Sequence, residues 1–201
     1  IKKMEAELDS LHEVSKVITS TFHVKVIMEH TYNELVRITR CEWYYVCFVD
    51  KESFEPAFNY EFGNQVLKEA GNIDYEQYVR NLAKSNPFSE PQIETLLREE
   101  KREIMAISLN VSDELIGAIF IGSSKTGVFS EVNLSFLKSL AGYVAIGIRN
   151  AEMFNNIYSQ KQEIEALYEQ AAASNEELNS YIKELDKTKE ELNQKNIELM
   201  T

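Results

Sequence analysis

Apolar side chains recur at helical spacing through the N-terminal part of the chain. In residues 4–18 they stand three or four positions apart, and a second run with the same spacing covers residues 24–38. Such spacing gathers apolar side chains on one face of a helix. The pattern predicts two amphipathic helices at the start of the chain.

Strand patterns follow these helices. Residues 43–49 are aromatic or β-branched on both faces, which indicates a central strand that is buried on two sides. Residues 54–62 alternate aromatic and polar side chains, which predicts a second strand. Residues 104–109 and 115–121 flank a short polar turn and predict a β-hairpin.

The segment between these strand pairs is polar and less regular. It predicts short helices at residues 75–84 and 91–102, with a proline-containing loop at 85–92. After the hairpin, Ser130 has the side chain of a helix N-cap, and helical spacing continues from about residue 131 to residue 200. The last glycine is Gly147 and every proline precedes it, so residues 148–201 contain no helix breaker.

The end of this last helix has an apolar residue at every seventh position. We assign these residues to heptad position d: Ile157, Ile164, Ala171, Leu178, Leu185, Leu192 and Leu199. Position a then holds Lys161, Tyr168, Asn175, Ile182, Lys189 and Asn196. The repeat predicts a parallel, two-stranded coiled coil, which the polar residues at position a weaken. The alternative is a helix that packs on another domain.

A homodimer through this helix is therefore expected. Its predicted interface consists of Ile157, Ile164, Tyr168, Ala171, Asn175, Leu178, Ile182, Leu185, Leu192, Asn196 and Leu199. A weak coil of this kind could change register or stagger when an attached domain changes state. We expect an output domain to be joined to its C-terminal end, as in a longer protein of which this chain is a part.

The order of elements predicts an α+β fold in which N- and C-terminal helices cover one face of an antiparallel sheet. Three parts are expected: an N-terminal helix at 1–20 that is associated with the dimer, a sensory domain at 11–154, and a coiled coil at 152–201. The domain and the coil share one helix, so no separate linker is predicted between them.

The domain at 11–154 resembles the GAF family. The resemblance is carried by Leu35-Val-Arg-Ile38, Phe48-Val-Asp50, Ala106-Ile-Ser-Leu109, Leu115-Ile-Gly-Ala-Ile-Phe-Ile121, Phe129 to Leu137, Leu140-Ala141 and Ile148-Arg-Asn-Ala151. Asn133 stands where the family usually has Asp. The resemblance implies a bacterial regulatory domain upstream of a histidine kinase, a diguanylate cyclase or a cyclic-di-nucleotide phosphodiesterase.

The resemblance also implies a ligand pocket between the sheet and the middle segment, on the face away from the terminal helices. From the family analogy and strand alternation, the expected floor is Tyr45, Cys47, Tyr60, Ile107 and Ile119, and the expected roof is Tyr75, Tyr78 and Phe88. Such a lining favours a small apolar or aromatic ligand over a phosphate. The alternative is that these aromatic side chains simply fill the core.

Charge and composition narrow the functional classes. The net charge of −12 disfavours nucleic-acid binding and binding to an anionic membrane surface. The longest apolar stretches, 115–121 and 143–148, are far shorter than the ~20 residues of a membrane span. If the apolar run that contains Cys41 and Cys47 is one strand, the two residues lie about 20 Å apart along it, too far to form a disulfide with each other. Two unpaired thiols suit a reducing, cytoplasmic location.

No set of residues in the sequence predicts catalysis. His12, His23 and His30 lack cysteines or carboxylates at the spacing of metal ligands, and Cys47 has the surroundings of a core residue rather than of a reactive thiol. We therefore expect no enzymatic activity, metal or cofactor. The predicted function is transmission of a ligand-induced or conformational signal through the dimeric helix, and the alternative is a ligand-free module for dimerisation and spacing.

Overall fold

The computed structural model describes residues 2–50, 56–68, 72–84, 93–99, 102–130 and 132–199. These residues belong to two compact units, Ile1–Phe154 and Asn155–Thr201. Each unit is described by itself. No helix in the described part of the chain is both long enough and apolar enough to cross a membrane.

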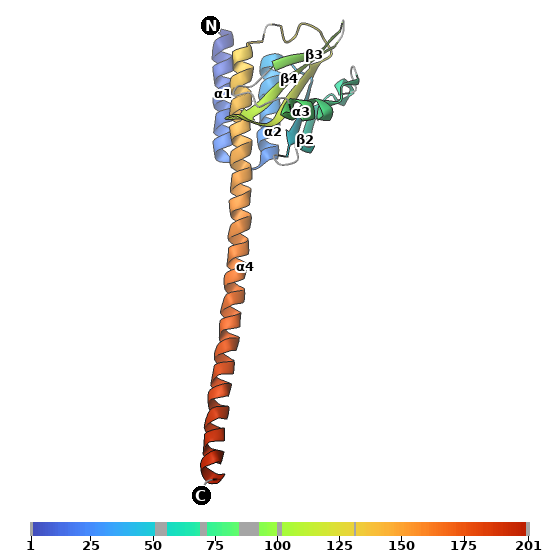
Figure 1. Ribbon diagram of the computed structural model, residues 1–201. Helices are drawn as coiled ribbons and strands as arrows, with labels where there is room; N and C mark the ends of the chain where they lie inside the picture. The colour runs from blue at the N-terminus through green and yellow to red at the C-terminus, as the bar shows by residue number, and fades with distance from the viewer. Residues whose placement is uncertain are drawn as a thin grey trace. The chain divides into compact units, whose positions relative to one another are not determined.

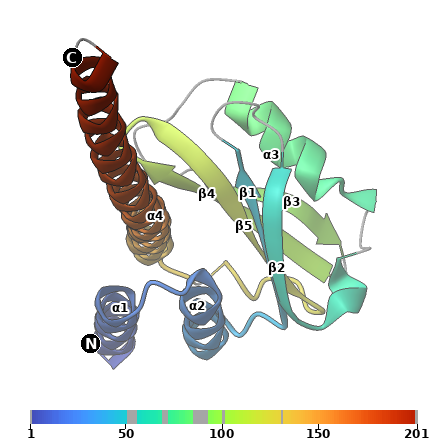
Figure 2. The same ribbon diagram turned by 90° about the horizontal axis from the view of Figure 1, so that it is seen from below.

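The first unit is built on a five-stranded antiparallel sheet with the order β2-β1-β5-β4-β3. The strands are β1 (Trp43–Val49), β2 (Pro56–Gly63), β3 (Ile93–Glu99), β4 (Arg102–Val111) and β5 (Glu114–Ser123). Helices α1 (Lys2–Ser20), α2 (Val24–Thr39) and the first part of α4 (Leu134–Leu199) lie on one side of the sheet (Figures 1 and 2). The shorter α3 (Tyr75–Lys84) lies on the other side, after the 3-10 turn η1 (Gln65–Leu67).

This architecture confirms the α+β fold with terminal helices on one face. Both N-terminal helices, β1, α3 and the β4–β5 hairpin form where the sequence predicts them. Strand β1 lies inside the sheet between β2 and β5 and is buried on both faces, as its unbroken apolar composition indicates. Residues 51–55, where the second predicted strand begins, lie outside the described residues.

Residues 93–99 correct one prediction, because they form strand β3 rather than part of a helix at 91–102. They pair with β4, and a β-bulge between Thr95 and Leu97 shifts the register. A bulge adds one residue to a strand and interrupts the alternation of its two faces. Both Leu96 and Leu97 therefore pack against the same apolar cluster, and the period of two is lost from the sequence.

The start of α4 corrects a second prediction. The helix begins at Leu134, and Asn133 rather than Ser130 is its N-cap residue, since the Asn133 Oδ1 accepts a hydrogen bond of 3.0 Å from the Ser135 N–H. The Ser130 hydroxyl instead donates to the Gly127 carbonyl within the preceding turn. Asn133 Nδ2 also donates to Glu7 Oε2 of α1, at 3.0 Å, so the cap also ties α4 to α1.

The sheet separates two apolar cores. The larger core lies between the sheet and the terminal helices, where Leu35, Leu137 and Val144 pack against Tyr44 and Val46 of β1. The smaller core lies between the sheet and α3. We call it the outer cluster: Trp43, Tyr45, Cys47, Tyr75, Val79, Ile104, Ala106, Ala118 and Phe120.

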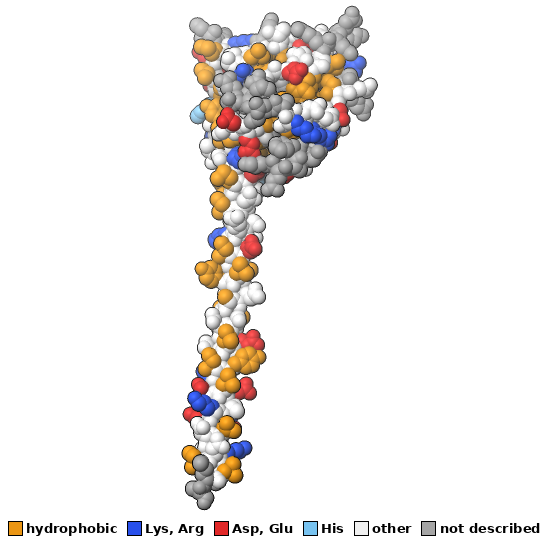
Figure 3. All heavy atoms as spheres, in the orientation of Figure 1, with side chains coloured by type: hydrophobic (Ala, Val, Ile, Leu, Met, Phe, Trp, Pro, Cys, Tyr) orange, Lys and Arg blue, Asp and Glu red, His pale blue; other side chains and the backbone are white. Residues whose placement is uncertain are grey.

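The second unit consists of the remainder of α4. Its described side chains, from residue 155 onward, are all exposed in the single chain. They include the large apolar residues at the heptad positions, with exposed fractions of 52% for Ile164 and 68% for Leu185. Figure 3 shows hydrophobic side chains recurring along this segment.

Candidate functional site

Four aromatic rings form the centre of the outer cluster. Trp43 and Tyr45, two positions apart on β1, stack with ring centroids 6.0 Å apart. The Tyr75 ring, at the start of α3, lies 5.4 Å from Trp43, 5.6 Å from Tyr45 and 4.8 Å from Phe120 of β5. All four side chains are buried. The rings therefore fill most of the space between α3 and the middle of the sheet.

Polar contacts hold α3 over this face. Asp74 Oδ1 accepts a hydrogen bond of 2.8 Å from the Gln77 N–H and so caps the N-terminus of the helix. One turn further on, the Tyr78 hydroxyl donates to Glu94 Oε2 of β3 at 2.7 Å, while its ring packs on Phe120. Burial, together with the hydrogen bond to Glu94, raises the pKa of Tyr78. The tyrosine therefore remains a neutral donor at physiological pH.

Glu61 of β2 connects the edge of the sheet to the aromatic rings. Its Oε1 accepts a hydrogen bond of 2.9 Å from the Trp43 indole N–H, and its Oε2 lies 3.1 Å from Lys68 Nζ. The same ammonium lies 4.6 Å from the centroid of the Tyr45 ring, which is a cation–π geometry. The carboxylate thus satisfies the buried indole and fixes a cation beside Tyr45.

A cavity of about 220 Å³ opens beside these groups. Its lining combines the rings of Tyr45 and Tyr75 with polar side chains, and consists of Tyr45, Asn59, Lys68, Ile73, Asp74, Tyr75 and Glu76. Its volume is below the ~300–1,000 Å³ of typical small-molecule pockets. The space therefore suits a small molecule with polar groups, or remains as a gap beside a closed aromatic core.

Tyr75 has one unusual feature. Its hydroxyl oxygen is buried and has no hydrogen-bond partner among the described residues. Burial raises the pKa of this tyrosine to about 12. Buried hydroxyls in proteins are usually hydrogen-bonded, so this oxygen, which is itself closed off from solvent, is an exception within the packing of the outer cluster.

Four of the predicted pocket residues lie together in or against the outer cluster. Tyr45 and Tyr75 line the cavity, whereas Cys47 and Tyr78 contribute to the surrounding packing. Phe88 lies outside the described residues. The prediction of this group rested on the resemblance to the GAF family combined with the alternation of β1.

The other three predicted floor residues lie on the opposite face, and that part of the prediction is wrong. Tyr60, Ile107 and Ile119 pack in the larger core under the terminal helices. The register explains why, because Val46 pairs with Tyr60 and with Ile119, and directly paired residues share a face of the sheet. Tyr45 is one position from Val46 and faces the other way.

The same register identifies site residues that the sequence prediction missed. Tyr45 pairs with Glu61 and Phe120, and Trp43 shares their face. Trp43 could have been found from its spacing of two from Tyr45. Phe120, Glu61 and Lys68 could not, because their positions depend on strand pairing and on the turn after β2.

The two cysteines are poor candidates for chemistry. Cys41 and Cys47 are both buried and unpaired. Burial is the main cause that raises the pKa of each thiol to about 11. The nucleophilic form of cysteine is the thiolate, which is scarce at neutral pH when the pKa is so high. The described residues also contain no group of three or more His, Cys, Asp or Glu side chains that could hold a metal.

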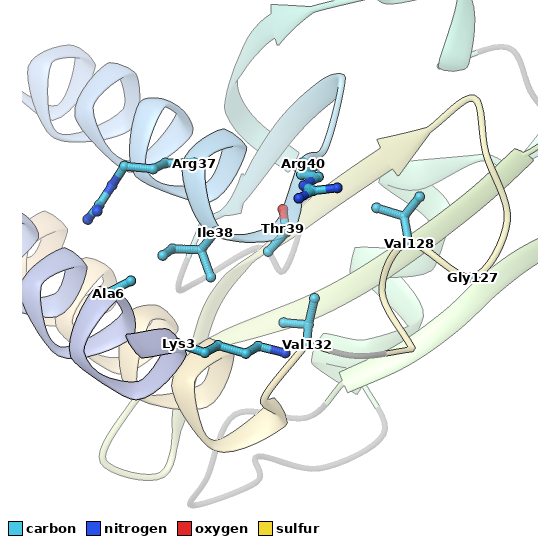
Figure 4. Close-up of a pocket in the computed structure, with 9 residues that line it drawn as sticks. All are labelled: Lys3, Ala6, Arg37, Ile38, Thr39, Arg40, Gly127, Val128 and Val132. Carbon is cyan, nitrogen blue, oxygen red and sulfur yellow. The ribbon is translucent and has the colours of Figure 1, made fainter. Parts of the chain in front are cut away.

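A larger cleft of about 450 Å³ lies on the helix side of the first unit. It is bordered by α1, the end of α2 and the turn before α4, and is lined by Lys3, Ala6, Arg37, Ile38, Thr39, Arg40, Gly127, Val128 and Val132 (Figure 4). The ends of its three basic side chains lie apart rather than converging on one point. Arg37 is also paired with Glu34 at 2.6 Å. The cavity beside the outer cluster is therefore the better candidate site.

Comparison with known proteins agrees with this fold. A family model described as "GAF domain" matches residues 23–150. The chain belongs to the GAF domain family. No curated protein sequence matches the chain significantly.

Solved structures of GAF domains share the fold at low sequence identity. The GAF domain of an Acinetobacter phosphoenolpyruvate-protein phosphotransferase has a TM-score of 0.52 and 15% identity, over 75% of this chain and 97% of that one. The GAF domain of a protein described as a sensor histidine kinase from Pseudomonas syringae pv. tomato has a TM-score of 0.58 and 10% identity, over 79% and 96%.

An enzyme shares the fold as well. The free methionine-R-sulfoxide reductase of Neisseria meningitidis, solved with its substrate, has a TM-score of 0.51 and 13% identity, over 73% of this chain and 90% of that one. At these identities the similarities establish the fold and leave the chemistry to be argued from this chain's own residues.

Proposed function

We propose that this GAF domain is a sensory or regulatory module that passes a signal through a dimeric coiled coil to an output domain. The observation that carries the proposal is the change in the surroundings of apolar residues along α4. Residues such as Leu137, Val144 and Ile148 are buried in the core of the GAF domain, and the same helix then presents exposed apolar residues at heptad spacing. Its narrow apolar stripe favours a partner helix over an isolated one.

The comparisons support this type of role without identifying the partner. Similar GAF domains occur in a phosphoenolpyruvate-protein phosphotransferase and in a protein described as a sensor histidine kinase. In our proposal the output domain is of a comparable signalling class, such as a kinase, a diguanylate cyclase or a cyclic-di-nucleotide phosphodiesterase. Thiol chemistry like that of a reductase is not part of the proposal, because Cys41 and Cys47 are buried with raised pKa values.

The proposed signal is a small aromatic ligand that carries polar groups and binds beside Tyr45 and Tyr75, where rings and polar side chains together line the cavity. The Lys68 ammonium, which lines the cavity beside the Tyr45 ring, would orient its polar groups. A specific observation also favours a second function, a ligand-free module for dimerisation and spacing. The aromatic rings already fill most of the space under α3, and the remaining cavity is small.

Two measurements test the proposal. Sedimentation should give a dimer, and a monomer at all accessible concentrations would contradict transmission through a coiled coil. A library of small aromatics, nucleotides and haem should contain a compound that raises Tm and changes the emission of Trp43, the single tryptophan. A ligand at one hundred times its Kd adds about 2.7 kcal/mol of stability. A dimer without any such ligand would favour the second function.

A further inference from the structure

Helix α1 covers one flank of α4 inside the GAF domain. Ile18 packs against Gly147, where an added Cβ would lie 2.8 Å from two carbons of the isoleucine side chain. About two turns further along α4, Phe22 after α1 stacks on Phe154 with centroids 4.0 Å apart and planes 4° apart. The seven-residue interval between Gly147 and Phe154 therefore marks the α1 side of the helix.

The neighbouring stripe of α4 in the same domain is open. Tyr143, Ile146 and Met153 are 43%, 48% and 54% exposed, and Asn150 between them is exposed too. These four residues are spaced three, four and three positions apart. Such spacing is that of the two core positions of a coiled coil.

The same spacing continues along the sequence into the heptad region. Three sets of positions at seven-residue intervals describe it, and we name them by their first members. The Tyr143 set continues through Asn150 to the regular residues Ile157, Ile164, Ala171, Leu178, Leu185, Leu192 and Leu199. The Ile146 set is Ile146, Met153, Gln160, Leu167, Ser174, Tyr181, Thr188 and Lys195. The Gly147 set is Gly147, Phe154, Lys161, Tyr168, Asn175, Ile182, Lys189 and Asn196.

We propose that a second copy of this chain docks in parallel on the Tyr143 and Ile146 sets of α4, beginning on the GAF domain itself at Tyr143. This inference rests on the dimer of the proposed function and specifies which surface forms it. It replaces the Gly147 set, which the sequence alone assigns to position a, because α1 occupies that flank within the domain. The Tyr143 set then takes position a and the Ile146 set takes position d.

The composition of the later heptads is compatible with this assignment. From residue 160 onward the Ile146 set contains one charged residue, Lys195, whereas the Gly147 set contains two lysines and two asparagines. Each set contributes two large apolar residues in this region. Moving the core from the Gly147 set to the Ile146 set therefore removes a charge from the seam and leaves the number of large apolar side chains unchanged.

A second copy is the occupant that the spacing selects. An isolated GAF domain would not need an apolar stripe with three-four spacing on its outer surface, and this stripe has the same spacing as the heptads that follow. In a parallel homodimer each position meets its own counterpart, so every apolar position of one chain is matched by the other. Met4 and Leu8 of α1 are also exposed, at 64% and 59%, and offer further apolar surface.

Cysteine cross-linking tests the register. In a parallel dimer, residues at core positions approach their counterparts closely enough for a disulfide, whereas outer positions do not. Each variant is the full chain with one residue replaced by cysteine and with the buried Cys41 and Cys47 retained. Each purified variant is then oxidised. Leu178→Cys reports the dimer in either register. Gln160→Cys and Lys161→Cys compare the two flanks, Tyr143→Cys reports docking on the domain, and Ser159→Cys is an outer control.

We expect L178C, Y143C and Q160C to form covalent dimers, and K161C and S159C to form few or none under the same oxidation, because their Cα atoms lie beyond the reach of a disulfide. Faster linking of K161C than of Q160C would overturn the register while leaving the dimer of the proposed function intact. Linking of L178C without Y143C would overturn docking on the domain, again with the dimer intact. If no variant links and the chain sediments as a monomer, the dimer of the proposed function fails with it.

Discussion

Ile18 of α1 lies against Gly147 of α4 so closely that the glycine cannot gain a side chain without a shift in packing. A Cβ at residue 147 would lie 2.8 Å from both Cγ1 and Cγ2 of Ile18. These atoms belong to a β-branched side chain whose χ1 is restricted in a helix, so they move less easily than the end of a flexible chain. This contact fixes how the first helix sits on the helix that leaves the domain.

Gly147→Ala should therefore destabilise the domain relative to a matched change at Gly142, where an added Cβ meets nothing within 4 Å. Gly142→Ala should stabilise by about 1 kcal/mol through helix propensity alone. Overpacking costs about 1–3 kcal/mol, so G147A should lie below G142A by a similar amount in urea unfolding.

The control for this pair is a double-mutant cycle. In an Ile18→Ala background the clashing atoms are gone, and G147A should then stabilise the chain as G142A does. Equal free energies of unfolding for G147A and G142A in the wild-type background would contradict the close packing of α1 on α4.

The hydrogen bond from Trp43 to Glu61 should contribute more to the free energy of unfolding than the ion pair between Glu61 and Lys68. Glu61→Ala leaves the fully buried indole N–H without its acceptor, which costs about 1–3 kcal/mol. Lys68 is 40% exposed, so Lys68→Ala should cost no more than about 1 kcal/mol. Glu61→Gln keeps an acceptor oxygen and is the matched control. Urea unfolding followed by Trp43 emission gives all three values, and equal losses for E61A and K68A would refute this division.

The buried thiols should make stability fall at alkaline pH. Burial raises the pKa of Cys41 and Cys47 from 9.0 to about 11, so between these values the folded chain retains protons that the unfolded chain has lost. Their contribution is complete below pH 9 and is lost as the pH rises towards 11. Tyr45 and Tyr78 have pKa values raised in the same direction, chiefly by burial.

Urea unfolding from pH 8 to pH 11 measures this decline. The Cys41→Ala, Cys47→Ala double variant should show a shallower decline than the wild type, even if it is less stable at pH 8. The same burial predicts that a thiol reagent at pH 8 labels the folded chain far more slowly than the urea-unfolded chain. Identical slopes for the two proteins would show that the thiols do not titrate differently on folding.

The sequence was sufficient for the elements whose patterns are local. Helices α1 and α2, strand β1 and the β4–β5 hairpin follow from spacing within each segment. Strand β3 was missed because its bulge hides the alternation, and the true N-cap of α4 lies three residues beyond Ser130. These errors come from local geometry that departs from the regular period.

The candidate site was only partly predictable, because it depends on which residues of different strands share a face. Alternation separates Tyr45 from its neighbours on β1, but it does not show that Phe120 rather than Ile119 lies beside it. A shift of one residue in register exchanges the two faces of a strand. The same limit applies to α4, where only the position of α1 distinguishes the covered flank from the open one.

Paired substitutions at Ser174 and Asn175 test that distinction by stability rather than by cross-linking. Ser174 belongs to the Ile146 set and Asn175 to the Gly147 set, and both are exposed in the single chain. If the Ile146 set lies in the seam at position d, Ser174→Leu should raise the Tm of the dimer and reduce its dissociation, because leucine at position d favours a two-stranded coil. Asn175→Ile would then lie beside the seam and have a smaller effect.

Burying one such side chain contributes about 1.5–3 kcal/mol, and each dimer gains two. Sedimentation equilibrium and thermal unfolding at matched concentrations measure both effects. A larger gain for N175I than for S174L would show that the Gly147 set, rather than the Ile146 set, lies in the seam.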